Sequence, residues 1–221
     1  MKSGMFLCIF ILFFSVTMRA QEDTTALQRG TIYPGYIITQ DNDTVEGWLL
    51  NINCWLNQHQ TFFYDDPDNH KGRIKYTANE LKEYKVGNRI YESIRFEGQY
   101  SSHKDNFFMR IITGPISYYL WYYDPDRSKL SPVSMTLNDI SDALLFEENE
   151  LSTQDLIRKL DGEMTNLGQL KYLVNFDKSM SKLVSDYPEL AEKIKNKEDG
   201  YQWIDKEKII REFNQWYLDN H

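Results

Sequence analysis

Cysteine is nearly absent from this chain of 221 residues, which contains only Cys8 and Cys54. Cys8 lies within an apolar N-terminal run that we expect to be removed, so Cys54 is the only thiol expected in the mature protein. A single thiol forms no intramolecular disulfide, and stability must therefore come from packing. Neither Asn53 nor Trp55 is cationic, which favours a packed, unreactive Cys54 over a nucleophile or an intermolecular bridge.

Long hydrophobic runs are also missing. The apolar run Met5–Val16 is shorter than the roughly 20 residues that a membrane-spanning helix needs. It follows Lys2 and precedes Met18-Arg19-Ala20, a pattern typical of a secretory signal peptide that is cleaved after Ala20. The alternative, a buried N-terminal helix, is disfavoured because such helices carry a polar face. We therefore expect an exported chain without a transmembrane segment, periplasmic or associated with the outer surface.

Basic residues are fewer than acidic ones. The chain has 25 Lys and Arg against 33 Asp and Glu, and the predicted signal peptide contains two of the basic residues and no acidic residue. The mature protein would thus carry 23 basic and 33 acidic residues, a net charge of −10. This balance disfavours nucleic-acid binding, which requires cationic side chains to neutralise phosphates. It disfavours electrostatic attraction to anionic lipid as well.

The motifs of common catalytic and cofactor sites are absent. The sequence has no HExxH, no GxSxG, no GxxxxGK[ST] and no GxGxxG, so it supports neither a zinc protease, a serine hydrolase nor a nucleotide site. Its four histidines form no close metal-ligand pair and are interpreted as surface residues: His59, His70, His103 and His221. We therefore predict a protein that is not an enzyme and has no cofactor.

Three acidic turns leave two alternatives open. Asp41-Asn42-Asp43, Asp65–Asp68 and Asp124–Asp126 each place carboxylates close together, and exported proteins meet calcium at high concentration. None matches the twelve-residue calcium loop, and Asp and Asn are ordinary turn formers. Two such carboxylates would also suit a glycosidase, provided that their separation is right. Calcium binding and a carboxylate-dependent hydrolase are therefore kept as alternatives.

Strands and turns are predicted from Thr31 to about Phe146. Tyr36–Thr39 and Val45–Leu50 flank Asp41-Asn42-Asp43, which suits a tight turn. Two further hairpins are predicted: Lys82–Val86 with Arg89–Ile94 around Gly87-Asn88, and Phe107–Thr113 with Ile116–Tyr123 around Gly114-Pro115. Consecutive hairpins predict a mainly antiparallel sheet, with a short helical turn over Thr77–Leu81 between strands.

Aromatic residues are abundant, with 15 Tyr, 12 Phe and 5 Trp. In Ile116–Tyr123 they fall on both faces of the predicted strand, because one face carries Tyr118 and Tyr122 between aliphatic residues. The other face carries Tyr119, Trp121 and Tyr123. One face would be covered by the C-terminal helices and the other by a partner or ligand, although aromatic residues commonly serve as core as well. Tyr119, Trp121 and Tyr123 are therefore the candidate ligand- or partner-binding residues, and no metal site is predicted.

The apolar period changes to that of helices from about Asn175. An apolar stripe runs from Phe176 to Tyr187, Pro188 ends it, and the following helix carries Leu190 and Ile194. Asp205 is expected to cap a last helix with one apolar side: Ile209, Ile210, Phe213, Trp216 and Tyr217.

The predicted fold class is α+β, a mainly antiparallel sheet of consecutive hairpins followed by a helical segment. The predicted organisation is a signal peptide over 1–20, a β-rich region over 21–146 and a mostly helical region over 147–221, the last two packed as one domain. Leu144–Leu170 is left open for a further strand or hairpin.

Four segments resemble uncharacterised exported proteins of Bacteroidetes. They are Tyr36–Gly47 with its "GYIIT…DT…G" hairpin, Ala78–Tyr84 with Arg89–Tyr91, Phe107–Tyr123, and Leu170–Leu173 through Asp186–Leu190. In many of those proteins, this soluble domain precedes an outer-membrane β-barrel. The present chain ends at His221 without such a segment, so we expect a free-standing version of the soluble domain. The resemblance implies no catalytic residue.

The leading hypothesis is an exported, non-catalytic interaction module of the bacterial cell envelope that contacts an envelope protein through apolar and aromatic side chains. A glycan- or small-ligand-binding periplasmic protein that uses the same aromatic residues is the first alternative, and the carboxylate-dependent hydrolase is the second. Nothing in the sequence indicates the oligomeric state.

Overall fold

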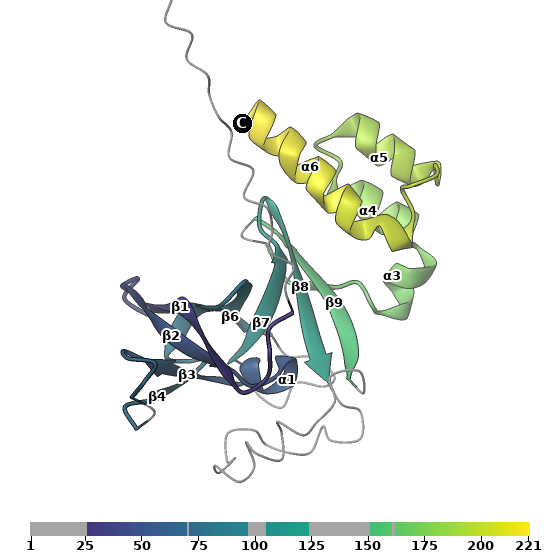
Figure 1. Cartoon of the computed structure of the whole chain (residues 1–221). Helices are drawn as coiled ribbons and strands as arrows, with labels where there is room; N and C mark the ends of the chain where they lie inside the picture. Colours follow the sequence, from purple (N-terminus) through teal and green to yellow (C-terminus); the bar gives the residue numbers. More distant parts are fainter. Residues whose placement is uncertain (1–25, 70, 97–104, 124–150, 161) are drawn as a thin grey trace, which may run out of the picture.

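The computed structural model describes residues 26–69, 71–96, 105–123, 151–160 and 162–221. The predicted signal peptide lies outside these residues, as do His70, His103, the acidic turn Asp124–Asp126 and the proposed boundary between residues 146 and 147. Within the described residues the fold is α+β, with one antiparallel sheet of ten strands and a cluster of helices at its C-terminal side (Figure 1). This confirms the predicted fold class.

The strands in chain order are β1 (Thr31–Thr39), β2 (Thr44–Asn51), β3 (Gln60–Tyr64), β4 (Ile74–Thr77), β5 (Leu81–Val86), β6 (Arg89–Arg95), β7 (Asp105–Ile112), β8 (Ile116–Tyr123), β9 (Ser152–Lys159) and β10 (Thr165–Asn166). In the sheet they follow the order β10-β9-β8-β7-β6-β5-β1-β2-β3-β4. Every neighbouring pair except β1 with β5 is also consecutive in the chain, which is the topology of successive hairpins.

The three predicted hairpins are present. β1 pairs with β2 across a turn in which Asn42 has φ 69°, and β5 pairs with β6 across Gly87, whose φ is 56°. Asn and Gly suit these left-handed positions. β7 pairs with β8, and the open segment Leu144–Leu170 contributes the hairpin β9–β10. The helical turn expected over Thr77–Leu81 is instead a single turn closed by the Glu80 N–H on the Thr77 carbonyl at 3.0 Å.

The sheet curls so strongly that the connection between β2 and β3 reaches β7 and β8 (Figure 1). This connection holds the short helix α1 (Cys54–Asn57), and Gln58 follows it. The Phe107 N–H donates to the Gln58 carbonyl at 2.8 Å, and the Gln58 side-chain amide bonds both backbone groups of Tyr122, at 2.6 and 2.8 Å. Gln58 thus joins β7 and β8 where their own pairing has ended.

The described residues form four buried apolar clusters, and the two largest lie inside the curl of the sheet and between the sheet and the helices. Inside the curl, β1, β2, β3, β5, β6 and β7 share a core that includes Ile37, Leu49, Phe63, Tyr84, Tyr91 and Phe107. The second core lies between β7–β9 and the helices, and it includes Ile116, Tyr118, Ile157, Met180, Ile194 and Phe213. β8 contributes to this second core from one face, as its period-two pattern predicts.

The helices are α3 (Leu170–Val174), α4 (Phe176–Leu183), α5 (Pro188–Lys195) and α6 (Lys206–Asn220), with a short 3₁₀ turn at Trp203–Asp205. Pro188 opens α5 and Leu190 and Ile194 are buried, as predicted. Asp205 precedes α6, but its carboxylate accepts the Gln202 N–H at 3.0 Å and does not cap α6. The prediction that the Asp205 side chain caps α6 is therefore wrong, because the carboxylate is already hydrogen-bonded within the 3₁₀ turn.

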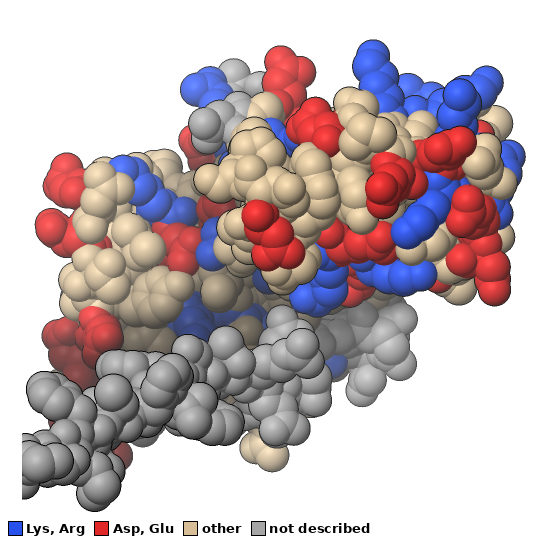
Figure 2. Space-filling view, turned by 90° about the horizontal axis from the view of Figure 1, so that it is seen from above, with Lys and Arg blue, Asp and Glu red and all other residues tan. Residues whose placement is uncertain are grey.

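Asn214 fixes α6 to the start of β8. Its Oδ1 accepts the Ile116 N–H and its Nδ2 donates to the Ile116 carbonyl, both at 2.8 Å in a buried setting. Gly114 permits this approach, since a Cβ there would lie 2.5 Å from the Asn214 Nδ2. The outer surface of the helical layer carries basic and acidic side chains interspersed, the pattern of a solvated surface (Figure 2).

Candidate functional site

The predicted aromatic face of β8 is covered by the chain itself over most of its length. Tyr119 has an exposed fraction of 0% and Trp121 of 3%. Phe108 packs against the Trp121 ring with centroids 5.0 Å apart, and His59 meets the same ring edge-on at 5.3 Å. Direct contact of Tyr119 or Trp121 with a partner would therefore require this cover to move. Their predicted binding role stays a prediction.

The hydroxyl of Tyr119 belongs to a polar ladder that crosses six neighbouring strands. The polar ladder consists of Tyr36 (β1), Glu83 (β5), Glu92 (β6), Arg110 (β7), Tyr119 (β8) and Arg158 (β9). Arg110 is its centre, because its guanidinium contacts Glu83 at 2.9 Å and Glu92 at 3.0 Å. Glu83 and Glu92 are directly opposite each other in the β5–β6 register, so their like charges depend on Arg110.

The outer members complete the polar ladder. The Tyr36 hydroxyl donates to Glu83 at 2.6 Å, and the Tyr119 hydroxyl donates to Glu92 at 2.8 Å. Arg158 contacts Glu92 at 2.5 Å and donates to the Tyr119 oxygen at 2.9 Å. Two arginines thus balance two glutamates, and the hydrogen bonds fix side chains on all six strands. We assign the polar ladder a structural role, since among the described residues every partner of its two carboxylates lies within the sheet.

The two tyrosines of the polar ladder predict how stability changes at high pH. Burial, then the hydrogen bond to Glu83, raises the pKa of Tyr36 to about 12, and burial with the nearby charge of Glu92 raises the pKa of Tyr119 to about 12. Between about pH 10 and 12 the unfolded chain releases these protons and the folded chain keeps them. The free energy of unfolding is therefore expected to fall as the pH rises through this window.

Urea unfolding at pH 8 and pH 11, with tyrosinate absorbance followed in parallel, measures this effect. The double variant Tyr36→Phe/Tyr119→Phe should lose less stability between the two pH values than the wild type. An equal loss in both proteins would show that other groups govern the alkaline unfolding.

The third predicted residue, Tyr123, lies at an accessible site. It lines a pocket of about 520 Å³, called here the polar pocket, together with Gln154, Asn166, Gln169 and Lys171 among others. These side chains offer amide, hydroxyl and ammonium groups that suit a hydrogen-bonding ligand. Of the three residues predicted from the aromatic strand, Tyr123 is thus the one that the fold places beside open space.

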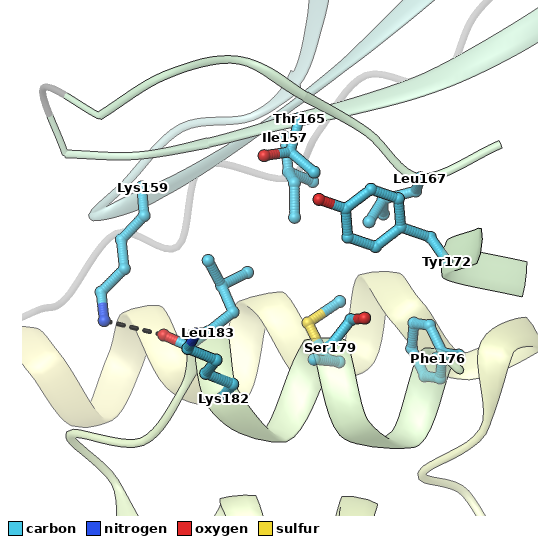
Figure 3. A pocket seen from close by; sticks show the side chains of 10 residues that line it. Ile157, Lys159, Thr165, Leu167, Tyr172, Phe176, Ser179, Lys182 and Leu183 are labelled. Atoms are coloured by element: carbon cyan, nitrogen blue, oxygen red, sulfur yellow. Dashed lines mark hydrogen bonds between the residues drawn. The ribbon is translucent and has the colours of Figure 1, made fainter. Parts of the chain in front are cut away.

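A second pocket, of about 470 Å³, lies between the β9–β10 hairpin and the helices α3 and α4 (Figure 3). We call it the apolar pocket, because aliphatic and aromatic side chains make its floor: Ile157, Leu167, Phe176, Met180 and Leu183. The two pockets lie on opposite sides of β10, since Thr165 lines the apolar pocket and the next residue, Asn166, lines the polar pocket. α3 contributes to both, through Tyr172 and Lys171 respectively.

α3 itself exposes apolar side chains between the two pockets. Leu170, Leu173 and Val174 are 75%, 44% and 69% exposed, and α3 has no buried residue. We call these three residues the α3 surface. The α3 surface was not predicted, because the helical pattern was expected to begin at about Asn175, although four of the five residues of Leu170-Lys171-Tyr172-Leu173-Val174 are hydrophobic.

The remaining candidates from the sequence are the single thiol, possible metal ligands and the histidines. Cys54 is buried, and the guanidinium of Arg89 donates a hydrogen bond to the Cys54 sulfur at 3.1 Å. Arg89 lies 35 residues from Cys54 in the chain, so the sequence around Cys54 did not indicate this cation. Among the described residues, no three His, Cys, Asp or Glu side chains gather as a metal ion requires. His59 is buried between Trp55 and Trp121, which corrects its interpretation as a surface residue.

No helix in the described part of the chain is both long and apolar enough to cross a membrane. Comparisons of the chain with protein-family models, curated proteins and solved structures found no match.

Proposed function

We propose that this protein is an exported, non-catalytic interaction module of the bacterial cell envelope, which binds an envelope protein through the α3 surface. The observation that carries the proposal is the exposure of Leu170, Leu173 and Val174 on one five-residue helix. Single exposed apolar residues are common, but a group of them beside hollows is typical of contact surfaces. The N-terminal sequence pattern of a signal peptide and the resemblance to exported Bacteroidetes proteins support the envelope location.

The physical reason is the cost of leaving these side chains in water. Covering apolar surface contributes roughly 25 cal/mol per Å², and a partner would gain this without disturbing the cores, since α3 buries none of its residues. The pockets on either side would accept side chains of the partner, which is how anchor residues usually gain affinity.

Site-specific photo-crosslinking in living cells tests this proposal. A photoreactive amino acid at Val174 is expected to give a discrete adduct with an envelope protein. The same amino acid at Leu218 on α6 is the matched control, because both positions are 69% exposed. Leu173→Asp should abolish the adduct while changing stability by less than about 0.5 kcal/mol, since the side chain is on the surface. Equal crosslinking from Val174 and Leu218 would contradict the α3 surface as the contact.

Binding of a small ligand is the second candidate function, and the two pockets favour it. Each has a volume within the roughly 300–1,000 Å³ of small-molecule sites. Tyr123 and the amide side chains of the polar pocket suit a glycan, whereas the apolar pocket suits a ligand of another chemical class. A thermal-shift screen against envelope glycans tests the polar pocket. A glycan that binds there should raise the melting temperature of the wild type more than that of Gln154→Ala, which removes one amide from the pocket.

A further inference from the structure

We infer that the apolar pocket binds an anionic amphiphile, a molecule with an apolar body and a carboxylate head. This inference rests on the second proposed function, binding of a small ligand, and names the chemical class for one of the two pockets. It is carried by the apolar floor of the pocket, its cationic end and three hydroxyl groups at its sides.

The floor determines the body of the ligand. Ile157 and Leu167, in and just after the β9–β10 hairpin, face Phe176 from α4 across the pocket, with Leu183 at one end (Figure 3). Met180, also on α4, lines the same pocket. The volume of about 470 Å³ is large enough for a small molecule and is enclosed on two sides by the hairpin and α4. Filling this space with an alkyl chain would remove apolar side chains from water.

The charge determines the head. Lys159 and Lys182 both lie at the Leu183 end of the pocket (Figure 3). The Lys159 ammonium donates to the Leu183 carbonyl and is paired with Asp186, both at 2.7 Å, so its charge is locally balanced. Lys182 has no ion pair with any residue in the described ranges, which leaves one uncompensated positive charge at this end. A carboxylate would complement it.

Hydroxyl groups supply the remaining polar contacts. Thr165 and Tyr172 line the pocket from the hairpin side and α3, and Ser179 lines it from α4 (Figure 3). None of these three hydroxyls has a hydrogen-bond partner among the described residues, although each can donate one and accept others. They would bind the oxygen atoms of a head group or of a substituent on the chain.

These features favour an amphiphile over a glycan. A glycan carries more hydroxyls than the polar side chains at the sides of the pocket could pair, and the remaining hydroxyls would lie unpaired against Ile157, Leu167 and Met180. An uncharged hydrocarbon would leave Lys182 and the three hydroxyls without use. A carboxylate on an alkyl chain matches both the floor and the charged end.

Dodecanoate, held below its micelle-forming concentration, is the probe. Isothermal titration calorimetry on the full mature chain is expected to give saturable binding with one ligand per protein. Dodecyltrimethylammonium, which has the same chain and the opposite charge, should bind at least about tenfold more weakly. The affinity for dodecanoate should fall as salt rises, because the head-group contact is partly exposed to solvent.

Two pairs of variants locate the binding. Ser179→Trp fills the pocket and should weaken dodecanoate binding at least about tenfold, whereas Ser185→Trp, just beyond α4 and outside the pocket, should leave it within about twofold. Lys182→Glu should weaken binding about three- to tenfold, and Lys178→Glu, the same charge change on an exposed part of α4, should not. Circular dichroism and thermal melting show whether each variant folds, and the Lys182 pair decides the question if Ser179→Trp does not fold.

Equal affinities for the two detergents, or unchanged binding in Ser179→Trp and Lys182→Glu, would overturn the inference. Binding of a maltooligosaccharide that is sensitive to Ser179→Trp would overturn the amphiphile and leave small-ligand binding standing. If neither detergent nor sugar binds saturably, both the inference and small-ligand binding at this pocket are wrong.

Discussion

Replacing Arg110 by Met is expected to lower the free energy of unfolding by about 3 kcal/mol, because it leaves two facing carboxylates without their shared counter-charge. The side chains of Arg110, Glu83 and Glu92 are 15%, 12% and 17% exposed, so water screens their charges little. Glu83 and Glu92 are directly opposite each other on β5 and β6. Met keeps much of the apolar stem of Arg110, and the loss therefore reports mainly on charge.

Urea unfolding of three variants measures this effect. Arg211→Met is the matched control, since its contact with Glu207 on α6 is 3.9 Å long and both side chains are about half exposed, and less than about 0.5 kcal/mol is expected. Adding Glu83→Gln to Arg110→Met should restore part of the lost stability, because one of the two facing charges is gone. A loss in Arg110→Met no larger than that in Arg211→Met would show that the polar ladder is energetically neutral.

Replacing Asn214 by Leu is expected to cost about 3 kcal/mol, the second large effect. The Leu side chain has a similar size but makes neither bond to Ile116, so a buried N–H and a buried carbonyl lose their partners. Each such group costs about 1–3 kcal/mol. Because Asn214 is the polar contact between α6 and the start of β8, the loss falls on the junction between helices and sheet.

Asn220→Leu provides the control for this prediction. Asn220 is an exposed residue of the same helix whose side chain donates to the Trp216 carbonyl at 2.7 Å, and its replacement should change stability by less than about 0.5 kcal/mol. Thermal unfolding followed by circular dichroism compares the two. Similar melting temperatures for Asn214→Leu and Asn220→Leu would mean that water or a neighbouring side chain replaces the bonds to Ile116.

The aromatic strand β8 shows which features of a site a local sequence pattern can predict and which it cannot. Alternation along Ile116–Tyr123 correctly predicts that both faces of β8 are covered. It says nothing of what covers them, because Phe108 and His59 come from other strands and connections. The accessible member, Tyr123, is distinguished from Tyr119 and Trp121 only by its position at the end of the strand beside β10 and α3.

By itself the sequence determined the elements whose signals are local. Gly87-Asn88 and Asp41-Asn42-Asp43 specify hairpins through backbone geometry, and Pro188 marks where α5 begins. The preceding helix α4 already ends at Leu183, so the prediction that Pro188 ends it is wrong. These signals act over a few residues and can therefore be interpreted along the chain.

Only the tertiary structure decided the features that join distant residues. Arg110 finds Glu83 and Glu92 from different strands, Gln58 bonds Tyr122 across 64 residues, and Asn214 bonds Ile116 across 98. The two pockets and the α3 surface arise in the same way, from where a curled sheet places the β9–β10 hairpin against the helices. The physical reason is that hydrogen bonds and ion pairs depend on distance and direction in space, which turn signals and apolar periods do not encode.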